Sequence, residues 1–372
     1  MGTLPQTYED SLKRICRDGI APAATATDRD HAFPHQAMEA LKTGGFWGAM
    51  SSPEVGGLGL GLRGAANIVR SVAEQCGSTA MVLCMHYSGV AVLEAYAPTD
   101  VRRAAAAGDH LSTLAFSEAG SRSHFWAPQS TATAQNGDVV LNASKSWVTS
   151  ASHATAYVWS SRPLEGEGFS TTANVPGLAV RGPFDGLGLR GNDSCPVTAN
   201  SVRVPRSAML GADGKGFDIM MGVVLPVFSI LNAACSVGFM NAATIRTAEH
   251  AAETRHADTA SALAELATIR NYVARMRIKA DMASTLVEDT IAAVEANRAD
   301  ASLRVLESKA AAGETAAEVL DLAMRICGGA AFRKELGVER YFRDSRAAGI
   351  MAPTTDVLYD FIGKAVCGLP LF

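Results

Sequence analysis

The sequence predicts an α+β protein built from three successive parts. We expect an N-terminal helical domain in residues 1–110, a middle antiparallel β domain in 111–210 and a C-terminal helix bundle in 211–372. Apolar residues recur at helical spacing in the first and last parts, whereas short runs rich in β-branched residues fill the middle part. Neither an internal repeat nor a low-complexity linker separates the parts, so we expect one compact unit.

The composition is that of a folded globular protein. Of the 372 residues, 48% are hydrophobic and 19% are charged, which supplies enough apolar surface for a core that spans several subdomains. The formal net charge is −4 and the arginines are scattered. We therefore expect neither nucleic acid nor an anionic membrane surface as the main partner.

Seven cysteines are spread along the chain without a CxxC pair. An odd number of separated thiols is typical of a reducing compartment, so we expect free thiols and no metal site. The N-terminal stretch MGTLPQTYEDSLKR is polar and has no apolar signal core, and we expect no membrane-spanning segment. A cytoplasmic location is therefore the expectation.

Helical periodicity in the first part is clearest in RGAANIVRSVAEQC, residues 63–76. Its apolar positions recur every three or four residues, which predicts a helix with one buried face, formed by Ala65, Ile68, Val69, Val72 and Ala73. The preceding stretch SSPEVGGLGLGL, residues 51–62, is glycine-rich but lacks the GxGxxG spacing that binds dinucleotide phosphates. We interpret it as a connecting loop.

In the middle part, STATAQNGDVVLNAS contains Asn136-Gly137 between two β-type runs. This dipeptide tolerates the positive φ angles of a type I′ turn, so the stretch predicts a β-hairpin. The further runs ATAYVWSS, GLAVRG and VTANSVRVP are rich in β-branched residues, which predicts a small antiparallel barrel or sandwich.

The last part carries the longest helical pattern. One face is formed by Leu263, Leu266, Ile269, Val273 and Met276, and the alanine-rich sequence to about residue 325 continues the pattern. We therefore expect long helices that pack as a bundle.

Four separated motifs follow one another along the chain. They are LAFSEAGSRSH (114–124), KSWVTS (145–150), GLGLRGNDSCPVTANSVRVPRSAMLG (186–211) and RICGGAAFRKELGVERYFRDSR (325–346). In this order they make the chain resemble the acyl-CoA dehydrogenase family. The resemblance implies an acyl-CoA dehydrogenase-like fold with a C-terminal four-helix bundle, FAD as the cofactor, and an acyl-CoA or acyl-carrier thioester as the substrate. It also implies a homodimer or homotetramer, with an electron-transfer flavoprotein as a candidate electron acceptor.

The first motif would meet both the flavin and the substrate, as the resemblance implies. Phe116 and Ser117 would contact the flavin, whereas Ser123 and His124 would lie beside the substrate. Taken singly, the two serines are equally well explained as residues that cap turns. The order and spacing of all four motifs carry the assignment.

The second motif would form the flavin wall. By the resemblance its cofactor residues are Trp147, Val148 and Thr149, with the indole beside the isoalloxazine and the threonine hydroxyl on the reactive ring. Hydrogen bonds of this kind are how a protein tunes the chemistry of a flavin. An isolated tryptophan would more simply be a core or interface aromatic.

The other two motifs supply an arginine and two glycines. By the resemblance Arg190 is a substrate contact, although a surface or strand-pairing role fits it equally well. Gly328 and Gly329 would let the backbone approach FAD closely, although a plain helix stop also explains them.

Three further cofactor residues are implied by the resemblance. Arg325 stands where a glutamine commonly precedes the two glycines, and its guanidinium would meet the FAD pyrophosphate. Arg255 stands near the position from which the family often sends an arginine to the FAD of the partner subunit. Thr354 follows the position of the family's catalytic glutamate.

That glutamate removes the α-proton of the thioester in the family's usual reaction, while a hydride passes from the β-carbon to the flavin. It is expected eight residues after Asp344, within RDSRAAGIMAPTTD (343–356), which we name the strap. The residue at that position is Ala352. The family's other base position lies on the first bundle helix, which has no acid from Met220 to Phe239. Loss of a general base costs about 10²–10⁴ in rate.

Asp356 is the nearest substitute for the missing base. An aspartate in the first turn of a helix that starts at Thr354 or Thr355 is also explained by helix capping alone. His86, Tyr87 and His124 are weaker candidates. We expect FAD-dependent α,β-dehydrogenation of an acyl thioester. The alternatives are desulfination of a sulfinoacyl-CoA, oxidase or monooxygenase chemistry, and a catalytically silent flavoprotein.

Overall fold

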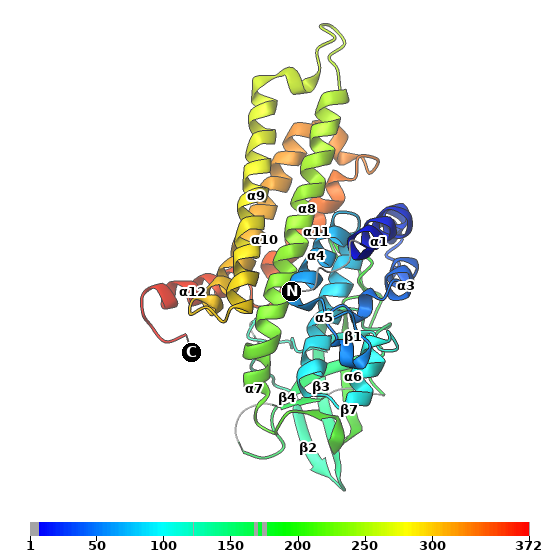
Figure 1. Ribbon diagram of the computed structural model, residues 1–372, viewed down its shortest axis with the longest axis vertical. Coiled ribbons are helices and arrows are strands. Elements are labelled where there is room, and N and C mark those ends of the chain that lie inside the picture. The colour runs from blue at the N-terminus through cyan, green and yellow to red at the C-terminus, as the bar shows by residue number, and fades with distance from the viewer. Residues whose placement is uncertain (1–6, 122, 167–169, 173–176, 372) are drawn as a thin grey trace.

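The computed structural model describes residues 7–121, 123–166, 170–172 and 177–371. It confirms the α+β fold class, with helices at both ends of the chain and strands between them (Figure 1). The long helices of the C-terminal part form one end of the elongated molecule, and the strands form the other end.

The N-terminal part is helical. Its helices are α1 (Thr7–Ile15), α2 (Ala24–Arg29), α3 (His35–Thr43), α4 (Gly61–Ala73), α5 (Gly77–Tyr96) and α6 (Thr99–Ala106). The predicted amphipathic helix is α4, and its five predicted apolar positions are all buried. The glycine-rich stretch before it contains one short 3-10 turn, Pro53–Val55, and otherwise connects elements as expected. Helix α5 is buried along most of its length, so it forms the centre of this part.

The middle part contains two four-stranded sheets in the described residues. The strands of the first, in spatial order, are β1 (Ser112–Ala115), β4 (Ala156–Ser161), β5 (Ser170–Thr172) and β8 (Met209–Leu210). Those of the second are β2 (Thr131–Gln135), β3 (Asp138–Val148), β7 (Cys195–Pro205) and β6 (Ala179–Val180). The β2–β3 hairpin is confirmed, with φ of 54° at Asn136 and 88° at Gly137.

One pairing in the middle part differs from the expectation of purely antiparallel strands. β1 and β4 are parallel, whereas the other pairs are antiparallel. The chain leaves β1, crosses to the other sheet to form the β2–β3 hairpin, and then returns to lie beside β1 in the same direction. A long connection of this kind is what a parallel pair requires.

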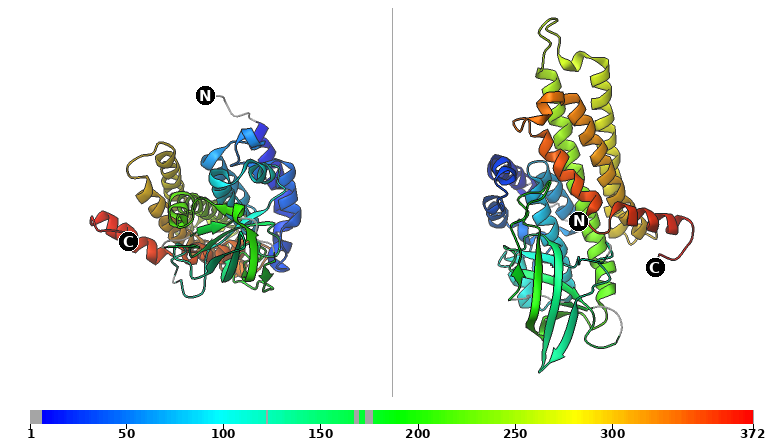
Figure 2. Two further views of the ribbon diagram at one scale, coloured as in Figure 1. Left: turned by 90° about the horizontal axis from the view of Figure 1, so that it is seen from below. Right: turned by 180° about the vertical axis from the view of Figure 1, so that it is seen from behind.

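The C-terminal part is a bundle. Its helices are α7 (Gly216–Ile219), α8 (Leu225–Glu253), α9 (Ala267–Glu295), α10 (Ala301–Cys327), α11 (Val338–Ile350) and α12 (Thr355–Val366). Helices α8 to α11 pack against one another, and α12 projects from the body of the molecule (Figures 1 and 2). Two residues of the predicted helical face, Leu263 and Leu266, precede α9 because the chain there forms a 3-10 turn and then extends.

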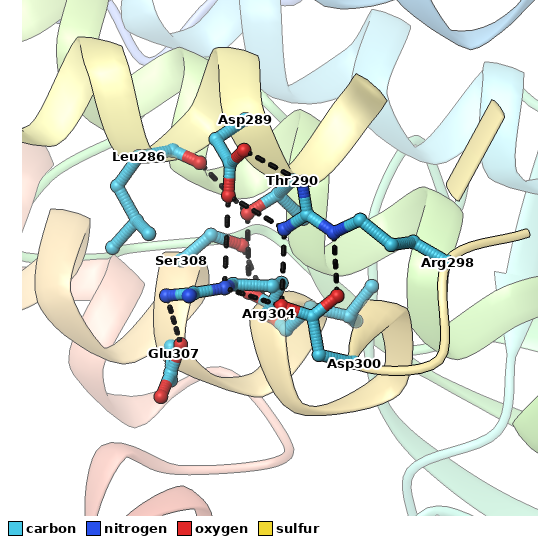
Figure 3. Close-up of polar contacts among 9 residues, drawn as sticks. Leu286, Asp289, Thr290, Arg298, Asp300, Arg304, Glu307 and Ser308 are labelled. Carbon is cyan, nitrogen blue, oxygen red and sulfur yellow. Dashed lines mark hydrogen bonds and ion pairs between the residues drawn. The ribbon is translucent and has the colours of Figure 1, made fainter. Parts of the chain in front are cut away.

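The long helical pattern is also interrupted at residues 296–300, between α9 and α10. Asn297 adopts a φ of 48°, a left-handed conformation that ends a helix. Arg298 then pairs with Asp289 at 2.8 Å and with Asp300 at 2.5 Å (Figure 3). These side chains are exposed, so the pairs add little stability individually but define the turn.

The helical stretch Gly216–Glu253 is, by length and composition alone, apolar enough to cross a membrane. In the structure, 83% of its most apolar window is buried inside the protein. A core helix that packs on all sides has the same composition, so we interpret this stretch as the centre of the bundle.

The three parts meet at the beginning of the strap. Arg343 on α11 donates two hydrogen bonds to the Asp28 carboxylate of α2, at 2.8 and 2.6 Å. Its neighbour Asp344 accepts a hydrogen bond from the backbone N–H of Leu189, at 2.6 Å. The loop before β7 is therefore fixed on α11, and Gly188 permits this close approach because a Cβ there would lie 2.5 Å from the backbone of Arg343.

We predict that Gly188→Ala lowers the free energy of unfolding by about 1–3 kcal/mol, because the added methyl group forces the loop away from α11. Gly222→Ala is the matched control, since a Cβ at that position meets no heavy atom within 4 Å. Chemical denaturation of both variants checks the prediction. Equal stability of the two variants would contradict the close packing of this loop.

Asp344 also predicts a pH dependence. Burial raises its pKa to about 6, so the folded protein holds this proton more tightly than the unfolded chain does. The stability associated with Asp344 is therefore greatest at low pH and falls by about 3 kcal/mol as the pH rises from about 4 to about 6. Asp344→Asn keeps an acceptor oxygen and cannot ionise.

We therefore expect the stability of the wild type relative to Asp344→Asn to decrease between pH 4 and pH 6, and to stay constant from there to pH 8. Unfolding free energies measured across this range give the comparison. A wild type that gains stability relative to the variant over the same range would reverse the sign and show that Asp344 is stabilised as a carboxylate.

Candidate functional site

A cavity of about 660 Å³ lies where the middle part meets the bundle. Its walls come from α5 of the N-terminal part, the end of β1 and the loop that follows, the end of β3, the loop before β7, the start of α8, and α11 with the strap. The apolar lining residues include Met85, Leu114, Phe116, Phe125, Leu189, Val224, Phe228, Ile350, Met351 and Ala352. The interior is therefore mostly apolar, as ligand sites commonly are.

The structure brings several predicted site residues together on this cavity. Phe116, Ser117, Ser123 and Trp147 line it, and so does Ala352 of the strap. Residues of the first and second motifs thus face the strap across one space, although more than 190 positions separate them in the sequence. Only the tertiary fold creates this proximity.

Trp147 has two unusual features. Its side chain is 70% exposed, although indoles are usually largely buried in folded proteins. Its φ angle is 56°, a strained conformation for a residue other than glycine. Strain of this kind concentrates at functional sites, and an exposed indole at an apolar cavity offers a flat face to a planar ligand.

Val148 and Thr149 lie behind this wall. Val148 is buried in the core of the sheet and does not line the cavity. The Thr149 hydroxyl lies 3.1 Å from that of Ser194, which does line the cavity. Alternation explains why Val148 points away from the face of Trp147. Thr149 follows the end of β3, where the strand pairing is already irregular.

A buried ion pair joins the first two motifs. Lys145 Nζ lies 2.6 Å from Glu118 Oε1, and the two side chains are 0% and 4% exposed. The ammonium also donates to the carbonyl oxygens of Ser160, at 2.8 Å, and Phe116, at 3.3 Å. Glu118 in turn accepts hydrogen bonds from the backbone N–H and the hydroxyl of Ser130.

Each charge of this pair changes the other's pKa. Burial raises the pKa of Glu118, but the Lys145 ammonium and the hydrogen bonds outweigh this effect and lower it overall. Burial lowers the pKa of Lys145 to about 8, against the opposing effect of Glu118. The carboxylate is therefore ionised at neutral pH and fully engaged, which makes Glu118 a structural residue.

Four predicted cofactor residues do not line the 660 Å³ cavity. Arg255 belongs to the α8–α9 connection and donates to the carbonyl oxygen of Ala260. Arg325 stacks on Tyr272 near the start of α9. Gly328 and Gly329 follow α10 and are exposed. The α8–α9 connection lies at the end of the bundle opposite the strands (Figure 1).

Asp356 and His124 line a second, separate hollow with Asp360 and Lys364. Asp356 is exposed there, and His124 stacks on Trp126. Thr354, predicted as a cofactor residue, immediately precedes α12, which starts at Thr355, one of the two expected start positions. None of these three predicted residues is among the described residues that line the 660 Å³ cavity.

Arg190 lies near Asp28, where burial raises the pKa of the carboxyl but Arg343, with a smaller effect of Arg190, lowers it overall. Its Nε is buried without a hydrogen-bond partner among the described residues. It does not line the cavity. Its position therefore favours a role at the domain junction over contact with a ligand in the cavity.

The weaker base candidates His86 and Tyr87 have hydrogen-bond partners within the protein. The His86 Nε2 donates to the carbonyl oxygen of Trp47 and its Nδ1 accepts from the backbone N–H of Ser112. Burial lowers the pKa of His86 to about 4, so the ring is neutral. The Tyr87 hydroxyl donates to the carbonyl oxygen of Phe46.

Sequence reasoning missed two features of the site. Asn192, within the third motif, lines the cavity and is 2% exposed, and its Oδ1 has no hydrogen-bond partner in the described structure. Because buried acceptors are normally hydrogen-bonded, we expect a ligand or a water molecule to donate a hydrogen bond to this oxygen. Lys309 on α10 binds the strap from behind. In the sequence, a lysine among the apolar positions of a predicted helix was the signal that could have pointed to Lys309.

The carboxylates that line the cavity are few. Among the described lining residues they are Glu118, which is engaged as above, and Asp185, whose side chain is 85% exposed and lies 3.6 Å from His31. Neither is an unpaired carboxylate in a dry environment, which proton abstraction beside a thioester requires. The cavity can therefore bind a planar group and an apolar chain, but it supplies no evident base.

Comparison with known proteins gives a consistent result. Three family models match in order: "Acyl-CoA dehydrogenase, N-terminal domain" at residues 5–105, "middle domain" at 113–202 and "C-terminal domain" at 214–367. The mitochondrial short-chain specific acyl-CoA dehydrogenase of Homo sapiens is 29% identical over 371 residues, which covers 95% of this chain and 88% of that protein.

Solved structures share the fold over nearly the whole chain. Butyryl-CoA dehydrogenase from Megasphaera elsdenii matches with a TM-score of 0.90 at 21% identity, covering 99% of this chain and 100% of that one. The prolyl acyl carrier protein oxidase AnaB matches with a TM-score of 0.88 at 17% identity, covering 98% and 100%.

We predict that Lys145→Met lowers the free energy of unfolding by about 3–5 kcal/mol, because it leaves the Glu118 carboxylate buried without its counter-charge. The double variant Lys145→Met/Glu118→Gln is the matched control, since it removes both charges together, and it should recover much of the loss. Denaturant unfolding measures both. A double variant less stable than Lys145→Met would contradict this account of the pair.

Proposed function

The chain belongs to the acyl-CoA dehydrogenase family, and on this premise we propose that it is an FAD-dependent oxidoreductase that acts on the acyl chain of a thioester. The observation that carries the proposal is the cavity wall on which Ser117 and the exposed, strained Trp147 face an apolar interior. When bound, FAD supplies the acceptor for a hydride from the acyl β-carbon.

The residues of the cavity fit such a cofactor. Trp147 presents a flat apolar surface for the isoalloxazine, and the Ser117 hydroxyl lies on the same wall. The unpaired Oδ1 of Asn192 would accept a hydrogen bond from an N–H group of the ligand. An apolar wall with a few placed polar groups is the usual form of a cofactor site.

The remaining surface fits an uncharged acyl chain. Phe228 and Val224 at the start of α8 face Met351 and Ala352 of the strap. No charged side chain stands among these four, so an apolar chain could enter without the loss of solvation that a charge would suffer. The thioester carrier is either coenzyme A or an acyl carrier protein, and the likeness to AnaB keeps the second in the proposal.

The proposal includes a homodimer or homotetramer. Trp147 lies near the end of β3, whereas Gly328 and Gly329 follow α10 and Arg255 lies in the α8–α9 connection, at the end of the bundle opposite the strands (Figure 1). We propose that these glycines and arginines, Arg325 included, serve the FAD of a second copy. A cytoplasmic location and an electron-transfer flavoprotein as electron acceptor belong to the same proposal.

A second candidate function is favoured by Ala352. Elimination from a sulfinoacyl thioester requires no α-proton abstraction, and hence no carboxylate at position 352. Oxidase or monooxygenase chemistry with oxygen belongs to the same second candidate. The remaining alternative is a flavoprotein without catalytic activity. The strained backbone of Trp147 argues against it, because such strain concentrates at functional sites. Flavin reduction by a saturated acyl thioester separates dehydrogenation from desulfination and from the inactive flavoprotein, and rapid reoxidation in air identifies an oxidase or monooxygenase.

We predict that Ala352→Glu accelerates anaerobic flavin reduction by a saturated acyl-CoA about 10²–10⁴-fold, since it places a base where the strap faces the cavity. Ala352→Gln is the matched control, because it has nearly the same shape without a proton-accepting carboxylate. Stopped-flow absorbance of the flavin band gives the rates.

Asp356→Asn tests the base predicted from the sequence in the same assay. An unchanged rate would exclude Asp356, and a loss of about 10²-fold or more would support it. If the wild type and Ala352→Glu both leave the flavin oxidised with every saturated thioester, dehydrogenation is not the reaction and the second candidate takes its place.

A further inference from the structure

Lys309 is a buried cation directly behind the strap. It lies on α10 and is 1% exposed. Its Nζ donates to three backbone carbonyl oxygens, those of Ala348 at 3.2 Å, Met351 at 3.0 Å and Pro353 at 2.8 Å. An ammonium group has three N–H donors, so these bonds use all of them.

The three carbonyl groups surround position 352. Ala348 lies in the last turn of α11, where carbonyl groups have no helical partner, and a cation at this end of a helix is favourable. Met351 and Pro353 precede and follow Ala352. Hydrogen bonds on both sides fix the backbone of Ala352, and with it the direction of its side chain toward the cavity that it lines.

Burying the ammonium group of Lys309 lowers the stability of the fold, whereas an apolar residue at this position would carry no such penalty. Lys309 forms no ion pair with a carboxylate of the described chain, and its Nζ lies 5.9 Å from the centroid of the Phe228 ring. Burial lowers the pKa of Lys309 to about 7, which reflects this cost. A methionine of similar length would fill the same volume without a charge, so the hydrogen bonds to the strap are what distinguishes lysine here.

We propose that Lys309 is a positioning residue, which holds the strap so that the side chain at position 352 faces the acyl end of the cavity. The inference deepens the proposed function and rests on it for the identity of the substrate. Lys309 itself does not line the cavity, and it acts through the strap backbone. The ring of Phe228, 5.9 Å from Lys309 Nζ, also lines the cavity.

The first test measures the strap without any reaction. In the FAD-bound protein, Lys309→Met should raise the hydrogen exchange of amides in residues 347–358 about tenfold, as expected from the loss of hydrogen bonds that fix them. Exchange in α9 should not change. Lys279→Met is the matched control, since Lys279 pairs with Glu318 on the bundle surface.

The second test uses position 352 as a reporter. If Lys309 sets the direction of this side chain, the gain in flavin reduction of Ala352→Glu should fall at least about tenfold in Ala352→Glu/Lys309→Met, and remain in Ala352→Glu/Lys279→Met. Lys309→Arg, which keeps the charge and the donors, should restore part of it. Lys309→Gln, which keeps two donors without a charge, provides a second variant should the methionine protein fail to fold.

The outcomes separate the two proposals. Unchanged strap exchange in Lys309→Met and Lys309→Gln overturns the positioning role, whatever the activity. Equal gains from Ala352→Glu with and without Lys309 also overturn it and leave the proposed function intact. Raised strap exchange together with no flavin reduction by Ala352→Glu supports the positioning role and contradicts dehydrogenation.

Discussion

The ion pair between Lys145 and Glu118 is the interaction on which the cavity wall depends. Two charges removed from water are stable only together, so the pair forces the loop after β1 and the end of β3 into one arrangement. Ser117 precedes Glu118, and Trp147 lies two residues after Lys145. The pair therefore places a hydroxyl and an indole on one wall, and its rigidity explains how Trp147 persists in a strained conformation.

Helix α11 provides the second support. Its Arg343 binds Asp28 of the N-terminal part, and its Asp344 binds the loop that precedes β7. Its last turn and the strap are held by Lys309 from α10. The cavity is therefore bounded by all three parts of the chain and exists only when they are docked. Residues that touch no ligand thus determine the shape of the space that a ligand would enter.

Local features of the fold were predictable from the sequence, because they depend on neighbours in the chain. Asn136-Gly137 forms its hairpin from its own φ preferences, and α4 buries the face that its spacing indicated. The order of the motifs, through the family resemblance, also placed Ser117 and Trp147 together. Asp356 illustrates what could not be predicted: one turn from Ala352 it lies in another hollow, because the start of α12 turns it away. The partners of Lys309 depend on how two helices pack, and spacing alone does not contain that information.

The most direct test of the account is an experimentally determined structure of the protein with FAD and an unreactive acyl thioester. We predict that the isoalloxazine packs against Trp147 in the 660 Å³ cavity and that the acyl chain extends between Phe228 and Ala352. Glycines 328 and 329 of a second copy would lie near the same FAD. A flavin bound elsewhere, or an acyl chain that does not reach Ala352, would contradict the central claim.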